Sequence, residues 1–169
     1  MSVEAPVILS AILVGIGATV VIDLWNLFLK RAFSIPSLNY CLLGRWLGHM
    51  TEGTFRHTSI GAAAQKPFEC TTGWIAHYTI GVVFAVVFVV LVSSDWLARP
   101  TLGPALLYGI GTVLFPLFIM QPSFGLGVAA SRTPNPSQAR LKSLGTHAAF
   151  GLGLYASAIG VRYLLQVHF

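Results

Sequence analysis

The stretch Gly73–Val92, GWIAHYTIGVVFAVVFVVLV, decides which class of fold this chain can adopt. It has the length of the roughly 20 apolar residues that an α-helix needs to cross a bilayer. His77 interrupts it with an ionisable imidazole, which is costly in hydrocarbon unless it faces other polar groups. The segment therefore predicts a membrane-spanning helix with one polar face.

The composition of the whole chain agrees with a membrane protein. The 169 residues are 55% hydrophobic and only 9% charged, whereas a soluble domain is typically about 25% charged. Further apolar runs of spanning length cover residues 6–29, 102–120 and 144–165. Helices are the expected structure, because lipid offers no partners to backbone groups. We predict an all-α fold with four transmembrane helices in a single domain, residues 1–169.

The basic residues predict the orientation of these helices. Of the ten Lys and Arg residues, only Arg99 and Arg162 lie outside the two long connections that follow the first and third spans. By the positive-inside rule, both long loops face the cytoplasm and both termini lie outside. Anionic lipid headgroups are then the expected partners of the basic loops. Nucleic acid is not, because no basic run alternates with exposed aromatic residues.

The first loop, residues 31–71, predicts a short amphipathic helix. Ser37 is a suitable N-cap for this helix. Its apolar side chains recur every four residues, at Leu38, Leu42, Trp46 and Met50. We expect it to lie on the inner membrane surface. Alternatively, the small pair Gly44 and Gly48 favours close packing on the bundle.

The two cysteines, Cys41 and Cys70, fall in this same loop. Two cysteines do not make a disulfide framework. Thiols stay reduced in the cytoplasm, where the charge distribution places the loop. The sequence therefore predicts two unpaired thiols.

Polar residues recur on the small-residue faces of three spans. Counting by fours, Asp23 follows Gly15 and Thr19, His77 lies between Gly73 and Gly81, and His147 lies between Ser143 and Gly151. At about 1.5 Å per residue, all three ionisable groups should lie near the inner ends of their helices. We predict a buried polar layer of Asp23, His77 and His147, with Asn26 and Tyr155 as further members.

Four interpretations of this layer remain open. It is a structural network that joins the helices, a proton or ion pathway, a metal or haem site, or the centre of a lipid-modifying enzyme with a histidine base. The candidate metal ligands are Asp23, His49, His57, His77 and His147. Four helices of one chain can enclose only a narrow transport pathway, so we expect a homo-oligomer or a larger membrane complex.

The motifs of the chain resemble a known family. They are GRWLGHM at 44–50, FRHTSI at 55–60, GWIAHYTIG at 73–81 and QPSFGLGVAASRTPNPSQARLKSLGTHAAFGLGLY at 121–155. Together they are similar to small bacterial inner-membrane proteins grouped under a domain of unknown function. The resemblance implies four spans and a bacterial inner membrane, and it implies no activity. The family pattern marks Arg45, His49, His57, His77, Gln121, Arg132, Arg140 and His147.

Overall fold

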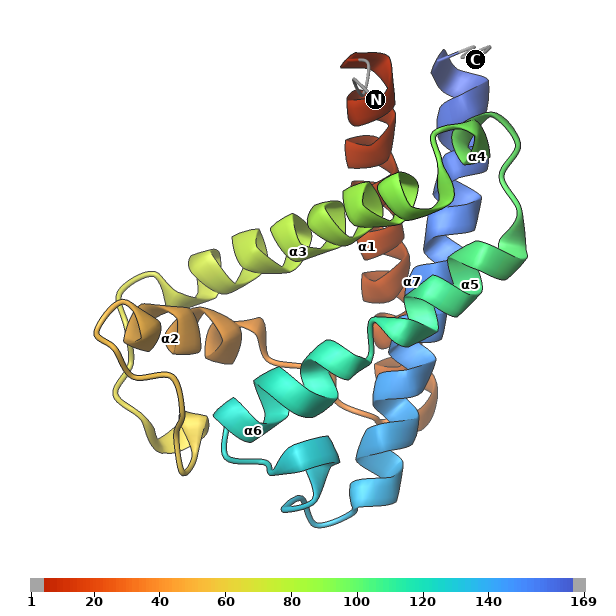
Figure 1. Cartoon of the computed structure of the whole chain (residues 1–169). Helices are drawn as coiled ribbons and strands as arrows, with labels where there is room; N and C mark the ends of the chain where they lie inside the picture. The colour runs from red at the N-terminus through yellow and green to blue at the C-terminus, as the bar shows by residue number, and fades with distance from the viewer. Residues whose placement is uncertain (1–4, 166–169) are drawn as a thin grey trace. The chain divides into compact units, whose positions relative to one another are not determined.

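The structure is a computed structural model that describes residues 5–165, and every regular element in this range is helical (Figure 1). Residues 1–4 and 166–169, which include both termini, lie outside the described residues. The elements are α1 (Ala5–Phe33), α2 (Tyr40–Met50), the 3₁₀ turn η1 (Ile60–Ala62), α3 (Glu69–Val92), α4 (Asp95–Ala98), α5 (Leu102–Gly111), the π-helical η2 (Pro116–Met120), α6 (Gln121–Ser123), the 3₁₀ turn η3 (Val128–Ala130) and α7 (Pro136–Leu165).

Within the described range, four helical segments are long and apolar enough to cross a membrane: Pro6–Phe33, Glu69–Val92, Leu102–Ser123 and Pro136–Leu165. The predicted all-α fold with four spanning helices is therefore confirmed. The last helix begins earlier than predicted, so Arg140 and Lys142 lie on α7 and not in the loop before it. Its start follows helix-capping rules, because the Asn135 side chain accepts a hydrogen bond from the Gln138 amide at 3.2 Å and proline suits the first helical turn.

The third spanning segment is not one continuous α-helix. Its α-helical part, α5, ends at Gly111, and the chain continues through the π-helical η2, which begins at Pro116. Proline has no N–H group, and its ring clashes with the carbonyl group four residues earlier, here that of Thr112. The regular α-helical hydrogen-bonding pattern is therefore interrupted at that carbonyl group. A π-helical turn is one way in which a helix accommodates such an interruption.

The described chain divides into two compact units, which we treat separately. The bundle unit contains residues 5–36, 78–112 and 146–165, and the loop unit contains residues 37–77 and 113–145. The predicted single domain is not tested by this division.

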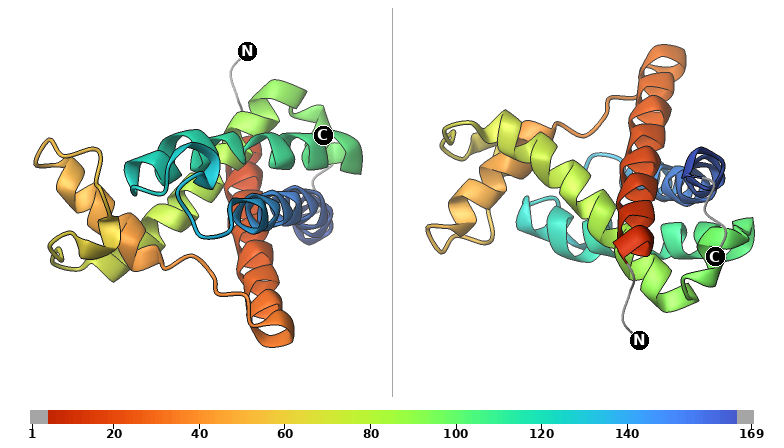
Figure 2. Two further views of the ribbon diagram at one scale, coloured as in Figure 1. Left: turned by 90° about the horizontal axis from the view of Figure 1, so that it is seen from below. Right: turned by 90° about the horizontal axis from the view of Figure 1, so that it is seen from above.

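The core of the bundle unit forms where helices cross at small residues. Its buried apolar residues are Val7, Ala11, Val14, Ala18, Ala85, Phe88, Val89, Trp96, Leu97, Ala105, Phe150, Leu154, Ala158 and Val161. Helices α1 and α7 cross (Figure 2), and a Cβ added to Gly17 would overlap with Ser157 Oγ. A Cβ at Gly109 in α5 would meet the backbone of Gly151 in α7 at 2.5 Å. Small residues allow such close approaches between membrane helices.

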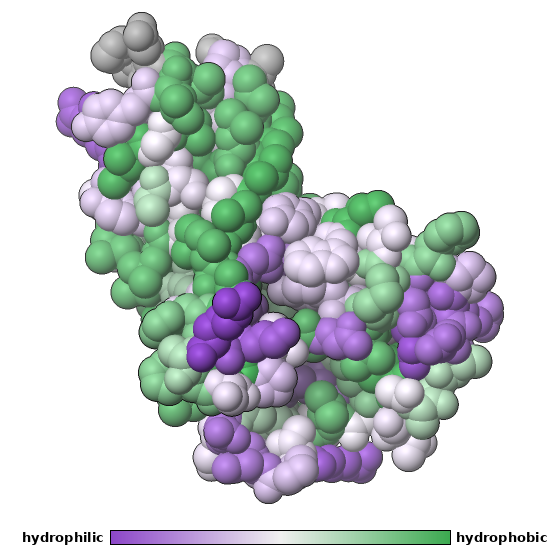
Figure 3. Space-filling view, turned by 180° about the vertical axis from the view of Figure 1, so that it is seen from behind, coloured by the Kyte–Doolittle hydropathy of each residue, from purple (hydrophilic) through white to green (hydrophobic). Residues whose placement is uncertain are grey.

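Large apolar side chains remain exposed along the spanning helices. Leu24, Val90 and Leu107 are 59%, 65% and 75% exposed. Figure 3 shows one face of the molecule, where apolar residues form broad surfaces and hydrophilic residues gather in separate patches. Surfaces of this kind are expected where lipid covers the protein. Trp96, on α4, is buried, with its ring centroid 4.7 Å from that of Phe88.

The loop unit is organised around a crossing between α2 and the start of α3. The N-cap of α2 is Asn39, whose side chain accepts from the Cys41 amide, so the predicted cap at Ser37 is wrong. A Cβ at Gly44 would overlap with the Glu69 carbonyl oxygen, and one at Gly73 with the Tyr40 carbonyl oxygen. The helix predicted to be amphipathic therefore packs on α3 through its glycine face.

A second contact of the loop unit joins the first long loop to the end of the third span. The amides of His57 and Ile60 donate to the carbonyl oxygens of Ser123 and Phe124 at 2.9 and 3.1 Å. Gly125 turns the chain with φ +87°, and a Cβ there would overlap with the Thr58 carbonyl oxygen. Glycine is therefore required at this position for two reasons, its backbone angle and the closeness of the neighbouring backbone.

Candidate functional site

Asp23 is hydrogen-bonded across the bundle unit. It lies on α1, and its Oδ2 accepts a hydrogen bond of 3.0 Å from the Tyr78 hydroxyl on α3. On the same face of α1, Thr19 is fully buried and Asn26 is 7% exposed. The small-residue face predicted for α1 is thus the face packed inside the unit, and Asp23 forms its ionisable end.

His147 makes the second interhelical hydrogen bond of this kind. Its Nδ1 lies 2.7 Å from the hydroxyl of Thr112, which follows α5. The Thr112 hydroxyl also lies 2.6 Å from the Gly109 carbonyl oxygen, which can only accept. Because a hydroxyl has one proton to donate, this geometry assigns a proton to Nδ1 of His147. Nε2 is then the basic nitrogen of the ring.

His77 lies in the loop unit and is held by aromatic rings. Its imidazole stacks on Tyr40, with ring centroids 4.0 Å apart and planes at 22°, and its edge faces Trp74. Tyr155 packs half-buried against the core of the bundle unit. A common layer of Asp23, His77 and His147 stays a prediction.

Arg45 holds the loop unit together. The sequence suggests a side chain pointing to water or headgroups, but Arg45 is only 7% exposed. Its Nη2 and Nε donate to the two Glu69 carboxylate oxygens at 2.7 and 2.8 Å. Its Nη1 donates to three backbone carbonyl oxygens, those of Ile60, Gly61 and Ala63. Hydrogen bonding to Glu69 raises the pKa of the Arg45 guanidinium, so the group is a permanent positive charge that ties α2, η1 and α3.

The two loop histidines, His49 and His57, lie side by side with ring centroids 4.9 Å apart. His49 Nε2 is 2.9 Å from the Ala64 carbonyl oxygen, and its Nδ1 is 3.8 Å from Glu52. Glu52 also pairs with Lys66, and this hydrogen bond lowers the pKa of the Glu52 carboxyl. Burial, and then the charge of His49, lower the pKa of His57. His57 Nε2 is buried without a hydrogen-bond partner among the described residues.

Acidification is expected to weaken the loop unit through His57. Its folded pKa lies below the ordinary 6.5, so the unfolded chain binds the proton first as the pH falls. The contribution of neutral His57 is fully present above about pH 6.5 and is lost as the pH falls toward the folded pKa. Thermal unfolding in detergent at several pH values should show a smaller acid loss for His57→Gln than for the wild type. Equal losses would contradict this assignment.

The remaining candidates lie in or beside the second half of the loop unit. Gln121 is buried and donates from Nε2 to Ser143 Oγ at 3.4 Å, while its Oε1 has no partner among the described residues. Arg140 is exposed and donates from Nε to the Ala129 carbonyl oxygen at 2.7 Å. Ala129 has φ 49°, a left-handed backbone angle that is strained for a residue other than glycine. The hydrogen bond from Arg140 therefore holds the carbonyl group of a strained residue. Arg132 is exposed on the same loop.

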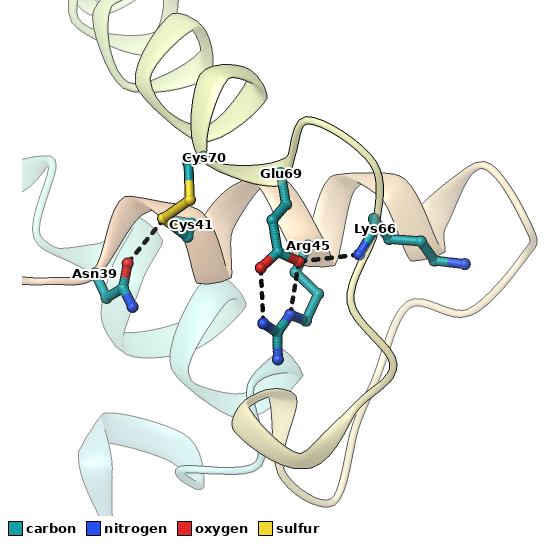
Figure 4. Close-up of a disulfide and its surroundings, with 6 residues drawn as sticks. All are labelled: Asn39, Cys41, Arg45, Lys66, Glu69 and Cys70. Atoms are coloured by element: carbon teal, nitrogen blue, oxygen red, sulfur yellow. Dashed lines mark hydrogen bonds and ion pairs between the residues drawn. A yellow bond between two sulfur atoms is a disulfide. The ribbon is translucent and has the colours of Figure 1, made fainter.

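The two cysteines are bonded to each other, which corrects the prediction of free thiols (Figure 4). Cys41 and Cys70 are each the second residue of a helix, α2 and α3 respectively. The crossing at Gly44 and Gly73 brings these two helix starts together. The compartment alone does not decide whether two thiols bond, because the bond also depends on how close the fold brings them.

The metal interpretation gains no set of ligands from residues 5–165, in which no three His, Cys, Asp or Glu side chains form a group that could hold a metal ion. What the structure brings together instead are pairs: Asp23 with Tyr78, His147 with Thr112, Arg45 with Glu69, and His49 with His57.

In three of these pairs, the sequence predicts only one of the two residues. Their partners, Tyr78, Thr112 and Glu69, are not among the predicted site residues. The sequence does contain a feature that could identify Tyr78, because it is a hydroxyl-bearing residue beside His77 in an apolar span. Thr112 had a weaker one, four residues before the helix-breaking Pro116. Glu69 is an acid at the start of an apolar helix, where negative charge is favoured.

The chain was compared with protein families, curated proteins and solved structures. Residues 12–161 match the family described as "Protein of unknown function (DUF2938)". No curated protein and no solved structure matches the chain. Because the match covers most of its length, the chain belongs to the DUF2938 family.

Proposed function

We propose that this member of the DUF2938 family is an integral membrane protein that moves protons, or an ion coupled to protons, through the bilayer. The observation that carries the proposal is that Asp23 and His147, two ionisable side chains on apolar spanning helices, are each hydrogen-bonded to a hydroxyl group from another element. Ionisable residues inside spans are costly, and they commonly mark ion and proton pathways.

The Asp23–Tyr78 pair has the chemistry of a proton relay. A carboxylate accepts a proton, and a tyrosine hydroxyl both donates and accepts hydrogen bonds. The 3.0 Å hydrogen bond joins α1 to α3, so the Tyr78 hydroxyl can pass its proton to the Asp23 carboxylate as it takes up another proton.

The His147–Thr112 pair supports the same role. With Nδ1–H directed at the Thr112 hydroxyl, Nε2 of His147 is the ring nitrogen that can accept a further proton. An imidazole that binds a proton at one nitrogen and releases one from the other can act as a proton shuttle. The break in the third span after Gly111 places Thr112 where it can make this bond.

A structural role is the second candidate, because the same two hydrogen bonds satisfy both side chains and join helix to helix. Such bonds contribute about 0.6 kcal/mol each on average in membrane proteins. In this case the variants below lose a little stability and no transport, which separates the two candidates.

Proton flux in vesicles tests the proposal. Asp23→Asn and His147→Gln keep the size of each side chain and remove its ionisation, and each is expected to slow flux about tenfold, as for a barrier raised by about 1.4 kcal/mol. Asp95→Asn is the matched control, because Asp95 is an exposed carboxylate on α4. Wild-type flux in both variants would remove Asp23 and His147 from the pathway.

The predicted setting of this activity is part of the proposal. We infer a bacterial inner membrane from the family resemblance, and we infer from the distribution of Lys and Arg that both long loops face the cytoplasm and both termini lie outside. The exposed Arg132 and Arg140 then contact anionic lipid headgroups. A homo-oligomer or a larger membrane complex completes a pathway that four helices alone enclose poorly.

A further inference from the structure

The disulfide of the loop unit lies in an unusual place for a permanent cross-link. Among the ten Lys and Arg residues, all but Arg99 and Arg162 lie in the first or third connection or at the helix ends that flank them. The positive-inside rule therefore places Cys41 and Cys70 on the cytoplasmic side. Thiol pools keep cysteines reduced there, and cytoplasmic disulfides are usually transient. A disulfide on the cytoplasmic side is consistent with the charge distribution if this bond forms and breaks reversibly in the folded protein.

The backbone keeps the two sulfur atoms together whether or not they are bonded. The α2–α3 crossing depends on Gly44 and Gly73, where any side chain would overlap with the opposite backbone. The Arg45–Glu69 pair lies next to the disulfide and joins the same two helices (Figure 4). Neither contact needs the S–S bond. Reduction therefore leaves two thiols side by side, ready to be oxidised again.

The two cysteines differ in access but share a favourable position. Cys70 is exposed, whereas Cys41 is half-buried behind it, so an attacking thiolate reaches the Cys70 sulfur first. Each cysteine is in the first turn of its helix. Unpaired N–H groups at a helix start favour negative charge, and a thiolate released there is a good leaving group.

We propose that Cys41 and Cys70 form a thiol–disulfide exchange site that cycles with cytoplasmic thiol reductants. A reductant thiolate attacks Cys70 Sγ, the S–S bond breaks, and Cys41 leaves as a thiolate that takes up a proton. A second reductant thiol then attacks the mixed disulfide and frees Cys70. The reductant ends as a disulfide and the chain gains two thiols, so two electrons and two protons are transferred. Reoxidation is the same exchange in reverse, with a small-molecule or protein disulfide as the acceptor of the two electrons and two protons. This site rests on the orientation given under the proposed function, and it does not depend on proton movement through Asp23 and His147.

Thiol trapping in cells tests the cycle. Cells that produce the full chain are quenched in acid, and free thiols are labelled with a maleimide that shifts the band on a gel. We expect wild-type protein to become oxidised after a pulse of a thiol oxidant and to return to the reduced form during recovery. Cys70→Ser is the matched control, because its single thiol forms no intramolecular bond.

Inside-out membrane vesicles identify the reductant. Adding either a small protein dithiol or glutathione to the exposed cytoplasmic face should release both thiols, and the faster of the two identifies the physiological class. The proposal is overturned if the pair stays oxidised in untreated cells and resists both reagents in these vesicles. It is equally overturned if the pair never oxidises after the pulse, or if only reductant applied to the outside of intact cells reaches it.

Discussion

Gly73→Ala is expected to separate α2 from α3. The added Cβ overlaps with the Tyr40 carbonyl oxygen, which belongs to backbone and cannot rotate away. Overpacking of this kind lowers the free energy of unfolding by about 3 kcal/mol. Gly44→Ala should cause a similar loss, because its added Cβ overlaps with the Glu69 carbonyl oxygen. Titration of the purified protein with denaturing detergent, followed by helical circular dichroism, measures the loss. A local readout is the rate at which Cys41 and Cys70 reoxidise, which should fall sharply.

The control for this experiment is a helix glycine in open space. A Cβ at Gly160 in α7 has no neighbour within 4 Å, so Gly160→Ala removes backbone freedom without a clash and should leave stability unchanged or raise it by up to about 1 kcal/mol. If Gly73→Ala and Gly160→Ala were equally tolerated, the close crossing of α2 and α3 would be wrong.

Arg45→Met is expected to destabilise the loop unit by about 3 kcal/mol or more, because it leaves the Glu69 carboxylate without its partner. The side chains of Arg45 and Glu69 are only 8% and 12% exposed, so water replaces little of the lost interaction. The variant also loses the hydrogen bonds to the carbonyl oxygens of Ile60, Gly61 and Ala63. Hydrogen exchange of the amides around these carbonyl groups should accelerate.

Two companion variants sharpen this test. Arg45→Met combined with Glu69→Gln should recover part of the loss, because no charge then stays buried alone. Arg56→Met is the matched control, since Arg56 is exposed, and such surface changes are usually within about 0.5 kcal/mol. Additive losses in the double variant would show that Arg45 and Glu69 do not interact.

Much of the fold follows from the sequence, because the properties that identify a membrane helix are local. Apolar length located all four spans, and counting by fours found the packed face of α1, where Thr19 and Ala11 are buried. The start of α7 was missed for a local reason as well. The charges of Arg140 and Lys142 suggest loop residues, although Asn135 and Pro136 form a recognisable helix start.

The site was less predictable, because its partners are distant in the chain. Asp23 and Tyr78 are 55 residues apart, and Thr112 and His147 are 35 apart. Helical spacing shows which face a residue occupies but not which residue of another helix it meets. The disulfide between Cys41 and Cys70 shows the same limit. It depends on how closely two helices approach, and that is set by Gly44 and Gly73 on opposite sides of the crossing.

The most direct test of the central claim, that this chain carries protons across a membrane, is the acidification of vesicles. Purified wild-type protein is reconstituted into lipid vesicles that contain a pH-sensitive dye, and a potassium diffusion potential, negative inside, is applied. The account predicts that the interior acidifies faster than in protein-free vesicles, with a rate that rises with the amount of protein. Acidification at the protein-free rate, with correctly folded protein in the bilayer, would contradict it.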